Sequence, residues 1–192
     1  MALEYEWKFR ADPAVLSAID GAFSGDREEL TMETTYYDTP SGALSSLRYT
    51  LRRRLENGVS ICTLKTPKGN ARGEWEAECD RIEDAVEKLV ALGCPSDLPT
   101  LVREGLTPIC GARFTRIAKT VVLPEATVEL ALDRGELLGG NRREPLCEAE
   151  VELKTGSIEA CDRFTRELAE QFGLQPEPRS KFSRALALYK GE

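Results

Sequence analysis

Large apolar and charged residues alternate at the start of the chain. Residues 3–10 read LEYEWKFR, so that Glu4, Glu6 and Lys8 fall between large apolar side chains. A period of two is typical of a β-strand and places the apolar groups on one face and the charges on the other. The pattern predicts an amphipathic strand whose apolar face covers a core.

The rest of the chain divides into further strands and helices. Runs of β-branched and aromatic residues bounded by Gly, Pro or Asn predict strands, and apolar residues at helical spacing predict helices. Strands are expected at 29–38, in a three-stranded meander over 48–80 with turns at 57–58 and 67–70, and at 111–123, 126–134 and 146–155. Helices are expected at 12–23, 81–92, about 101–104, 157–172 and 180–190.

Each predicted strand carries one charged face. Arg52 and Arg54 share a face opposite Arg53, while Glu-x-Glu patterns recur at 74–78 and at 148–152. A solvated sheet face explains the alternation but not this distribution, because like charges on one face repel each other. In a closed barrel with its polar face inward, these groups would need water, each other and an ion that satisfies both signs.

Composition narrows the classes of protein. The chain has 192 residues, 41% of them hydrophobic and 31% charged, which suits one domain with a substantial core. Its net charge of −7 argues against general affinity for nucleic acid or anionic lipid. The sequence shows neither a secretory signal nor an apolar run of the roughly 20 residues that a spanning helix needs. We therefore expect a soluble, cytoplasmic protein.

The residues available for chemistry indicate oxygen ligands. Histidine is absent, and the six cysteines are scattered without a C-x-x-C pair, so neither a zinc site nor a disulfide framework is predicted. Carboxylates suit a hard divalent cation such as Mg²⁺ or Mn²⁺, while arginine and lysine suit phosphate oxygens. A metal-bound polyanionic phosphate would satisfy both.

These features resemble the CYTH domain family, the triphosphate tunnel metalloenzymes. Glu4, Glu6 and Lys8 match its E-x-E-x-K signature. The other blocks follow in order: YYDTP at 36–40, LRRR at 51–54, TLK at 63–65, RGEWE at 72–76, VELALDRGEL at 128–137, EAEVELKTG at 148–156 and SK at 180–181. The last strands look most like the bacterial inorganic triphosphatase branch.

The resemblance implies an α+β fold, a closed eight-stranded antiparallel β-barrel with a charged interior and helices packed outside. We expect a single CYTH domain over residues 1–192. Some members of that branch carry a helical CHAD domain after the CYTH part, and we expect none in this chain.

The resemblance also implies a site. The expected phosphate-binding residues are Lys8, Arg52, Arg54, Lys65, Arg116 and Lys181. The expected metal ligands are Glu4, Glu6, Glu148, Glu150 and Glu152, with Lys8 and Glu76 as catalytic residues. Glu76 would orient the attacking water, or else pair with an inward arginine. Strand register alone does not choose between Arg113 and Arg116, and only one of Tyr36 and Tyr37 can face the interior.

The implied activity is metal-dependent hydrolysis of inorganic triphosphate to pyrophosphate and phosphate. Adenylate cyclase and thiamine triphosphatase are the rivals on the same fold, and a non-catalytic module that binds polyphosphate or nucleotide is the rival from another class. We expect a small-molecule triphosphate as the partner, with no nucleic acid and no membrane. Homodimerisation is left open.

Overall fold

The computed structural model of the chain describes residues 5–68 and 71–192. Its strands are β1 (Glu6–Arg10), β2 (Arg27–Asp38), β3 (Thr50–Glu56), β4 (Val59–Lys68), β5 (Ala71–Glu78), β6 (Thr107–Val122), β7 (Ala126–Gly139), β8 (Arg142–Gly156) and β9 (Gln175–Pro176). Its helices are α1 (Pro13–Ala22), α2 (Ala43–Ser46), α3 (Ile82–Ala91), α4 (Leu98–Leu101), α5 (Ile158–Phe172) and α6 (Lys181–Lys190).

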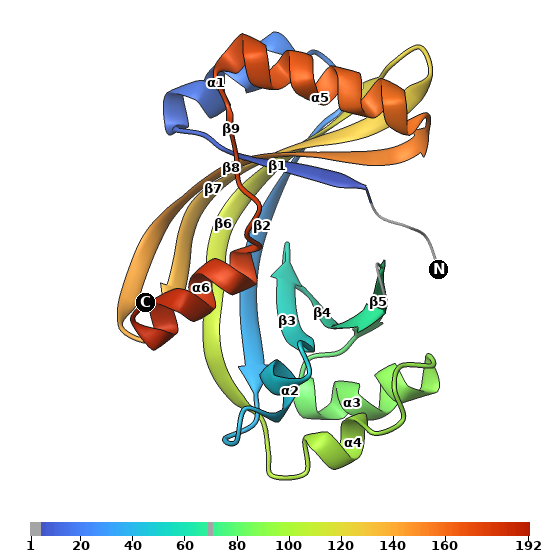
Figure 1. Cartoon of the computed structure of the whole chain (residues 1–192), viewed down its shortest axis with the longest axis vertical. Coiled ribbons are helices and arrows are strands. Elements are labelled where there is room, and N and C mark those ends of the chain that lie inside the picture. The colour runs from blue at the N-terminus through green and yellow to red at the C-terminus, as the bar shows by residue number, and fades with distance from the viewer. Residues whose placement is uncertain (1–4, 69–70) are drawn as a thin grey trace.

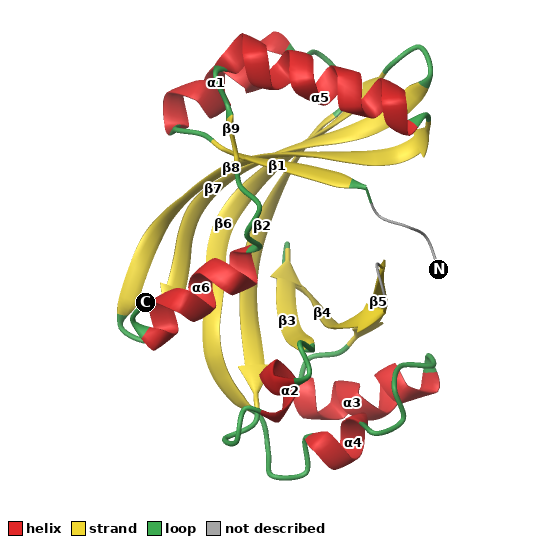
Figure 2. Ribbon diagram, viewed as in Figure 1, coloured by secondary structure: helices red, strands yellow, loops and turns green. Residues whose placement is uncertain are grey.

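The strands form one strongly curved antiparallel sheet (Figures 1 and 2). The strand order is β5-β4-β3-β2-β6-β7-β8-β1-β9. The long strands β2, β6, β7 and β8 form the middle of the sheet, and the short strands lie at its edges. The α+β class is confirmed.

The predicted closed barrel is not shown by the part of the chain that the structure describes. No ladder of backbone hydrogen bonds joins β5 to β1 or β9, so the sheet stays open between its two edges. The sheet therefore forms a deep, open trough whose inner face is charged.

Two groups of helices cover the outer face, as expected. α1 and α5 pack on β1, β7 and β8 around a core that includes Ile19, Leu130, Val151 and Leu168. α3 and α4 pack on β3–β5 around a second core. Figure 1 shows these as two separate layers on the outside of the curve.

The expectation that the helices pack outside is wrong for α6. This helix packs against Phe114, Leu137 and Leu146 through residues that include Phe182 and Ala185. Phe114 shares its strand face with Arg116, two residues on, and Arg116 lines the charged cavity. α6 therefore fills one end of the inner face, because that end is apolar and needs cover.

Local signals explain most element boundaries. Asp12 caps α1 by accepting a hydrogen bond from the Val15 amide at 2.8 Å, and Ser157 and Ser180 cap α5 and α6 in the same way. The predicted strand at 126–134 extends to Gly139 as β7. It passes Gly135, where a Cβ atom would lie 2.0 Å from the Arg113 carbonyl oxygen. Glycine is thus required at this close approach.

The short helix expected at about 101–104 begins earlier, at Leu98, because Pro99 suits a first helical turn. The sequence predictions omitted α2 and the two-residue strand β9. α2 is held by the buried Asp38, whose carboxylate accepts hydrogen bonds from the amides of Leu44 and Ser45. Among the described helices, none is both long and apolar enough to cross a membrane.

Candidate functional site

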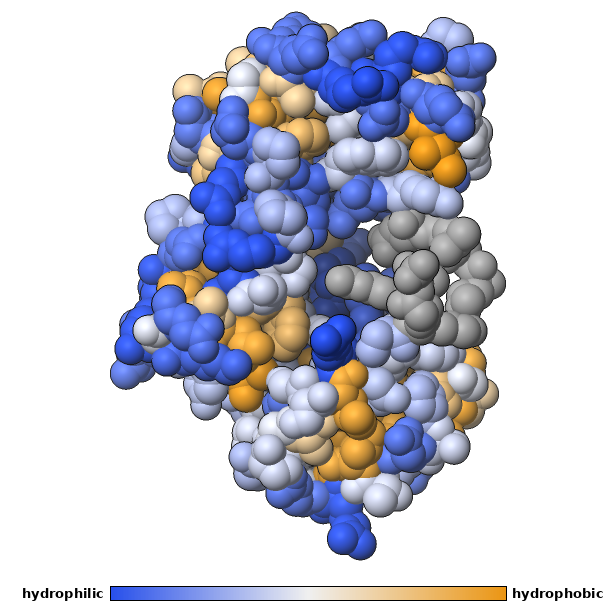
Figure 3. Space-filling view, in the orientation of Figure 1, coloured by the Kyte–Doolittle hydropathy of each residue, from blue (hydrophilic) through white to orange (hydrophobic). Residues whose placement is uncertain are grey.

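The inner face of the sheet encloses a charged cavity of about 420 Å³. It opens between the end of the molecule that carries α1 and α5 and the end that carries α3 and α4, where Figure 3 shows a hydrophilic hollow. Its lining includes many of the predicted site residues: Glu6, Lys8, Arg52, Arg54, Lys65, Glu76, Arg116, Glu150, Glu152 and Lys181. Glu148 is fully buried and is not part of this lining, and Glu4 lies outside the described residues.

Strand alternation decides which arginines of β3 reach the cavity. Arg52 and Arg54 line it, whereas Arg53 points to the other face and donates a hydrogen bond to the Asp80 carbonyl oxygen at 2.9 Å. The predicted register of this strand is confirmed. In β2 the same rule brings Tyr36 to the cavity and leaves Tyr37 packed against the outer core.

The structure settles the choice between Arg113 and Arg116. Arg116 points inward and donates two hydrogen bonds to the Asp133 carboxylate, from Nε to Oδ1 at 2.7 Å and from Nη2 to Oδ2 at 2.8 Å. A further hydrogen bond joins it to Glu150. Arg113 lies on the exposed outer face, 3.0 Å from Glu33.

Lys181, the first residue of α6, is the centre of a buried ion cluster. Its ammonium group lies 2.8 Å from Asp133, 2.6 Å from Glu148 and 2.6 Å from Glu150. Burial lowers the pKa of Lys181, but the three carboxylates outweigh burial and raise it above its usual range. Burial likewise raises the pKa of Glu150, while Lys181 and Arg116 lower it by more, so its net pKa falls below its usual range. Both groups are therefore charged near neutral pH.

Carboxylates suitable for a divalent cation gather on β7 and β8. Asp133, Glu148 and Glu150 offer oxygens within 4.8 Å of one another, close enough for one ion. The donor set is oxygen only, which fits Mg²⁺ or Mn²⁺. Lys181 contacts all three of these carboxylates. On β1 and β8, the carboxylates that line the cavity are those of Glu6, Glu150 and Glu152.

Arginines with unused donors face these carboxylates. The Nε atoms of Arg52 and Arg54 are buried, and neither has a hydrogen-bond partner among the described residues. Burial, then the neighbouring charges of Arg52 and Arg116, lower the pKa of Arg54 to about 10. An anion in the cavity would supply the missing acceptors and relieve the repulsion between these cations.

Glu76 and Lys65 lie on the same wall. Glu76 is half exposed, accepts a hydrogen bond from the Thr63 hydroxyl at 2.9 Å and lies 3.9 Å from Arg52 Nη2. It is thus placed either to orient a water or to pair with an arginine, the two roles predicted for it. Lys65 pairs with Glu74 at 3.0 Å.

The sequence analysis missed two buried charged residues near the cavity. Arg184, one turn after Lys181 on α6, donates to Glu148 and lies 2.5 Å from Glu144. Its spacing from Lys181 was the one signal available. Glu177 is fully buried in the loop before α6, where it pairs with Arg10 at 2.6 Å and Arg179 at 3.2 Å. Its amide donates to the Lys8 carbonyl oxygen at 2.9 Å, a link that no local pattern indicates.

Comparison with known families supports the resemblance. The CYTH domain model matches residues 2–186, and the chain belongs to this family. It is 27% identical over 166 residues to an inorganic triphosphatase of Haemophilus influenzae. That match covers 85% of this chain and 47% of the relative, so the chain spans about half the length of that curated relative.

Solved structures share the fold. PH1819 from Pyrococcus horikoshii matches with a TM-score of 0.61 and 24% identity, over 98% of this chain and 99% of that one. HpAC1 from Hippeastrum, a proposed adenylyl cyclase described as having a dominant triphosphatase activity, matches with a TM-score of 0.63 and 17% identity, over 100% and 96% of the two chains. At these identities, both matches establish the architecture alone.

Proposed function

We propose that this protein hydrolyses inorganic triphosphate to pyrophosphate and phosphate with Mg²⁺ or Mn²⁺. The observation that carries the proposal is that Arg52 and Arg54, which face cavity carboxylates, each have a buried Nε donor without a hydrogen-bond partner among the described residues. A short phosphate chain bound to a cation would satisfy both groups of residues, because arginine binds phosphate oxygens and carboxylates bind the metal. Family membership and the triphosphatase relative support a triphosphatase-type enzyme.

The phosphate-binding residues in this proposal come from both sides of the cavity. Arg52, Arg54 and Lys65 would hold the chain from the β3–β4 wall. Lys8, Arg116 and Lys181 would approach from the opposite wall, where carboxylates already keep Arg116 and Lys181 charged. These cations would stabilise the charge that spreads over the phosphoryl group during transfer.

The metal ligands in this proposal are Glu6, Glu150 and Glu152, with Glu4 as a further predicted ligand. When bound, the cation would neutralise phosphate charge and make a coordinated water more acidic. Glu148 lies behind Lys181 and Arg184 and would serve mainly to hold them, while its predicted role as a ligand remains a prediction. Glu76 would orient the water that attacks the terminal phosphorus.

The cavity lining is mostly charged and polar. Among the described lining residues, the aromatic ones are Tyr36 and Phe182, whose ring centroids lie 4.9 Å apart. They pack on each other within the apolar cluster under α6. Adenylate cyclase and thiamine triphosphatase remain the alternative enzymes, and capture of polyphosphate without turnover the alternative outside catalysis. The cytoplasmic location, the single-domain span and the absence of nucleic-acid and membrane partners also remain predictions.

A substrate panel tests the proposal. Tripolyphosphate, pyrophosphate, ATP and thiamine triphosphate would each be incubated with Mg²⁺ or Mn²⁺, and both phosphate and cyclic AMP measured. We expect the fastest turnover with tripolyphosphate and its loss in excess EDTA. Cyclic AMP as the main product, or full activity in excess EDTA, would contradict the proposal. Tight binding of tripolyphosphate without turnover would favour the binding module.

A further inference from the structure

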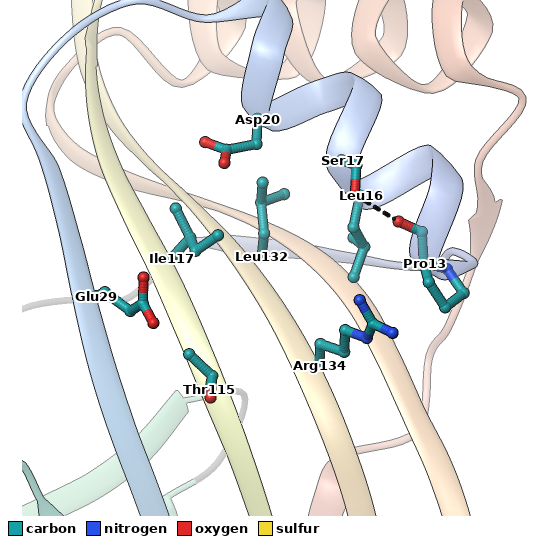
Figure 4. A pocket seen from close by; sticks show the side chains of 9 residues that line it. All are labelled: Pro13, Leu16, Ser17, Asp20, Glu29, Thr115, Ile117, Leu132 and Arg134. Carbon is teal, nitrogen blue, oxygen red and sulfur yellow. Dashed lines mark hydrogen bonds between the residues drawn. The ribbon is translucent and has the colours of Figure 1, made fainter.

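A second cavity lies on the outer face of the sheet, between α1 and strands β2, β6 and β7 (Figure 4). Its volume is about 190 Å³. Its walls are formed by Pro13, Leu16, Ser17, Asp20, Glu29, Thr115, Ile117, Leu132 and Arg134. None of these residues belongs to the charged inner cavity, so this outer pocket is a separate feature.

The outer pocket has an apolar floor and one uncompensated positive charge. Leu16, Ile117 and Leu132 form the floor, and the Arg134 side chain rises beside them toward α1 (Figure 4). Across the described residues, Arg134 forms no hydrogen bond and no ion pair. The two acidic wall residues differ, because Asp20 lies 2.6 Å from Lys119 and Glu29 lies 3.3 Å from Arg27. The charge that lacks a partner is therefore positive.

The hydrogen-bonding groups of the outer pocket also favour an anionic ligand. The Ser17 hydroxyl donates to the Pro13 carbonyl oxygen at 2.9 Å, so it can only accept a bond from a ligand. The donors available are the Arg134 guanidinium and the hydroxyl of Thr115, its partner in the β6–β7 register. A planar guanidinium suits a carboxylate, which it can bind through two parallel hydrogen bonds.

We propose that the outer pocket binds a small monocarboxylate with a compact, branched apolar body. The volume is below the roughly 300–1,000 Å³ of pockets for drug-sized ligands, so the ligand must be small. Asp20 and Glu29 would repel the second charge of a phosphate or a dicarboxylate. The apolar body would pack against the half-buried Ile117, beside the buried Leu16 and Leu132 at the floor of the pocket.

The outer pocket lies directly behind the ion cluster of the inner cavity. Leu132 and Arg134 flank Asp133 on β7, and Thr115 and Ile117 flank Arg116 on β6. Because successive side chains of a strand point to opposite faces, these neighbours face outward while Asp133 and Arg116 face inward. The two sites share strands but not space, so their ligands should not compete.

Isovalerate is a suitable probe, because it joins one carboxylate to a branched apolar group. It would be titrated into the ¹⁵N-labelled full chain, with amide shifts followed by NMR. We expect saturable shifts that include Leu16, Ile117 and Leu132, with a Kd on the order of millimolar. Absence of saturation at about 100 mM, roughly a hundredfold above that Kd, would overturn the proposal.

Two comparisons test the role of Arg134. Arg134→Gln should weaken binding at least about tenfold, as should replacing isovalerate by its uncharged amide. The matched control is Arg166→Gln, an exposed arginine of α5 outside the pocket, which should bind like the unaltered protein. Equal binding by Arg134→Gln, or equal binding of the amide, would overturn recognition of the carboxylate.

Saturating tripolyphosphate provides the last comparison. It should leave the affinity for isovalerate within about twofold, since the two cavities lie on opposite faces of the sheet. Displacement of isovalerate by tripolyphosphate would place the probe in the inner cavity and overturn the proposal. Binding is measured without turnover, so this result does not depend on whether the chain is a triphosphatase.

Discussion

The ammonium nitrogen of Lys181 lies 2.6 Å from a carboxylate oxygen of Glu148, which is fully buried. This contact joins α6 to β8 at the base of the charged cavity. Glu148 also accepts a hydrogen bond from Arg184, one turn further along α6. A single carboxylate on β8 thus positions two cations of the helix.

Glu148→Gln should therefore destabilise the protein. Removing one charge from a buried, hydrogen-bonded cluster typically costs about 3–5 kcal/mol, because the partner charges remain buried. Urea unfolding at pH 7 measures the change. Glu144→Gln is the control, since Glu144 contacts the same Arg184 but is 41% exposed, and its loss should cost about 1 kcal/mol or less. Equal losses in the two variants would show that burial does not set the cost.

Arginine substitutions on β3 test the two faces of that strand. Arg52→Ala and Arg54→Ala should weaken tripolyphosphate binding roughly ten- to a hundredfold, the usual effect of losing a charge-assisted contact. Arg53→Ala, on the outer face, should do much less. Calorimetric titration of tripolyphosphate into each metal-loaded variant measures the difference. If Arg53→Ala were the most impaired, the inner cavity would not be the phosphate site.

The opening strand separates function from stability. Glu6→Gln should lose most Mg²⁺-dependent triphosphatase activity, while the protein stays folded, because Glu6 lines the cavity and is about one-third exposed. Trp7→Ala should instead destabilise the fold by about 3–5 kcal/mol, since Trp7 packs against the core under α1 and α5. Thermal melts and phosphate release measure both effects. Normal turnover in Glu6→Gln would remove this residue from the proposed metal site.

Glu177 predicts a pH-dependent contribution to stability. Burial raises the pKa of Glu177, but hydrogen bonds from Arg179 and Arg10 lower it by more. The net pKa falls from an ordinary 4.5 to about 2. A carboxyl whose pKa is lower in the folded state stabilises that state fully above the unfolded pKa. This contribution is lost as the pH falls through the folded value. The stability deficit of Glu177→Gln should therefore be largest above about pH 4.5 and shrink toward pH 2.

Urea unfolding of both proteins between pH 2 and pH 7 tests this window. Glu167→Gln, an exposed substitution on α5, should stay within about 0.5 kcal/mol of the unaltered protein at pH 7. A constant deficit for Glu177→Gln across the range would mean that lost packing, not lost charge, explains it. Because the Glu177 amide also holds the Lys8 carbonyl, this loop links the first strand to α6.

Alternation along the chain by itself determined which charges share a face. It separated Arg52 and Arg54 from Arg53, and it placed Glu150 and Glu152 on one side of β8, as the structure confirms. The reason is local, because successive side chains in a strand must point to opposite faces whatever the strand pairs with. The capping residues Asp12, Ser157 and Ser180 were readable for the same reason.

Tertiary structure alone decided which charges meet, how deep each lies and whether the sheet closes. Arg10 and Glu177 are 167 residues apart in sequence, and Lys181 and Glu148 are 33 apart, so no local pattern couples them. Arg113 and Arg116 lie on opposite faces of β6, and the sequence does not say which face turns inward. The apolar cluster around Phe114, which shares a face with Arg116, shows this only in the folded structure. The return of α6 onto that cluster buries Lys181 and Arg184, because an apolar inner surface must be covered and α6 carries the side chains that cover it.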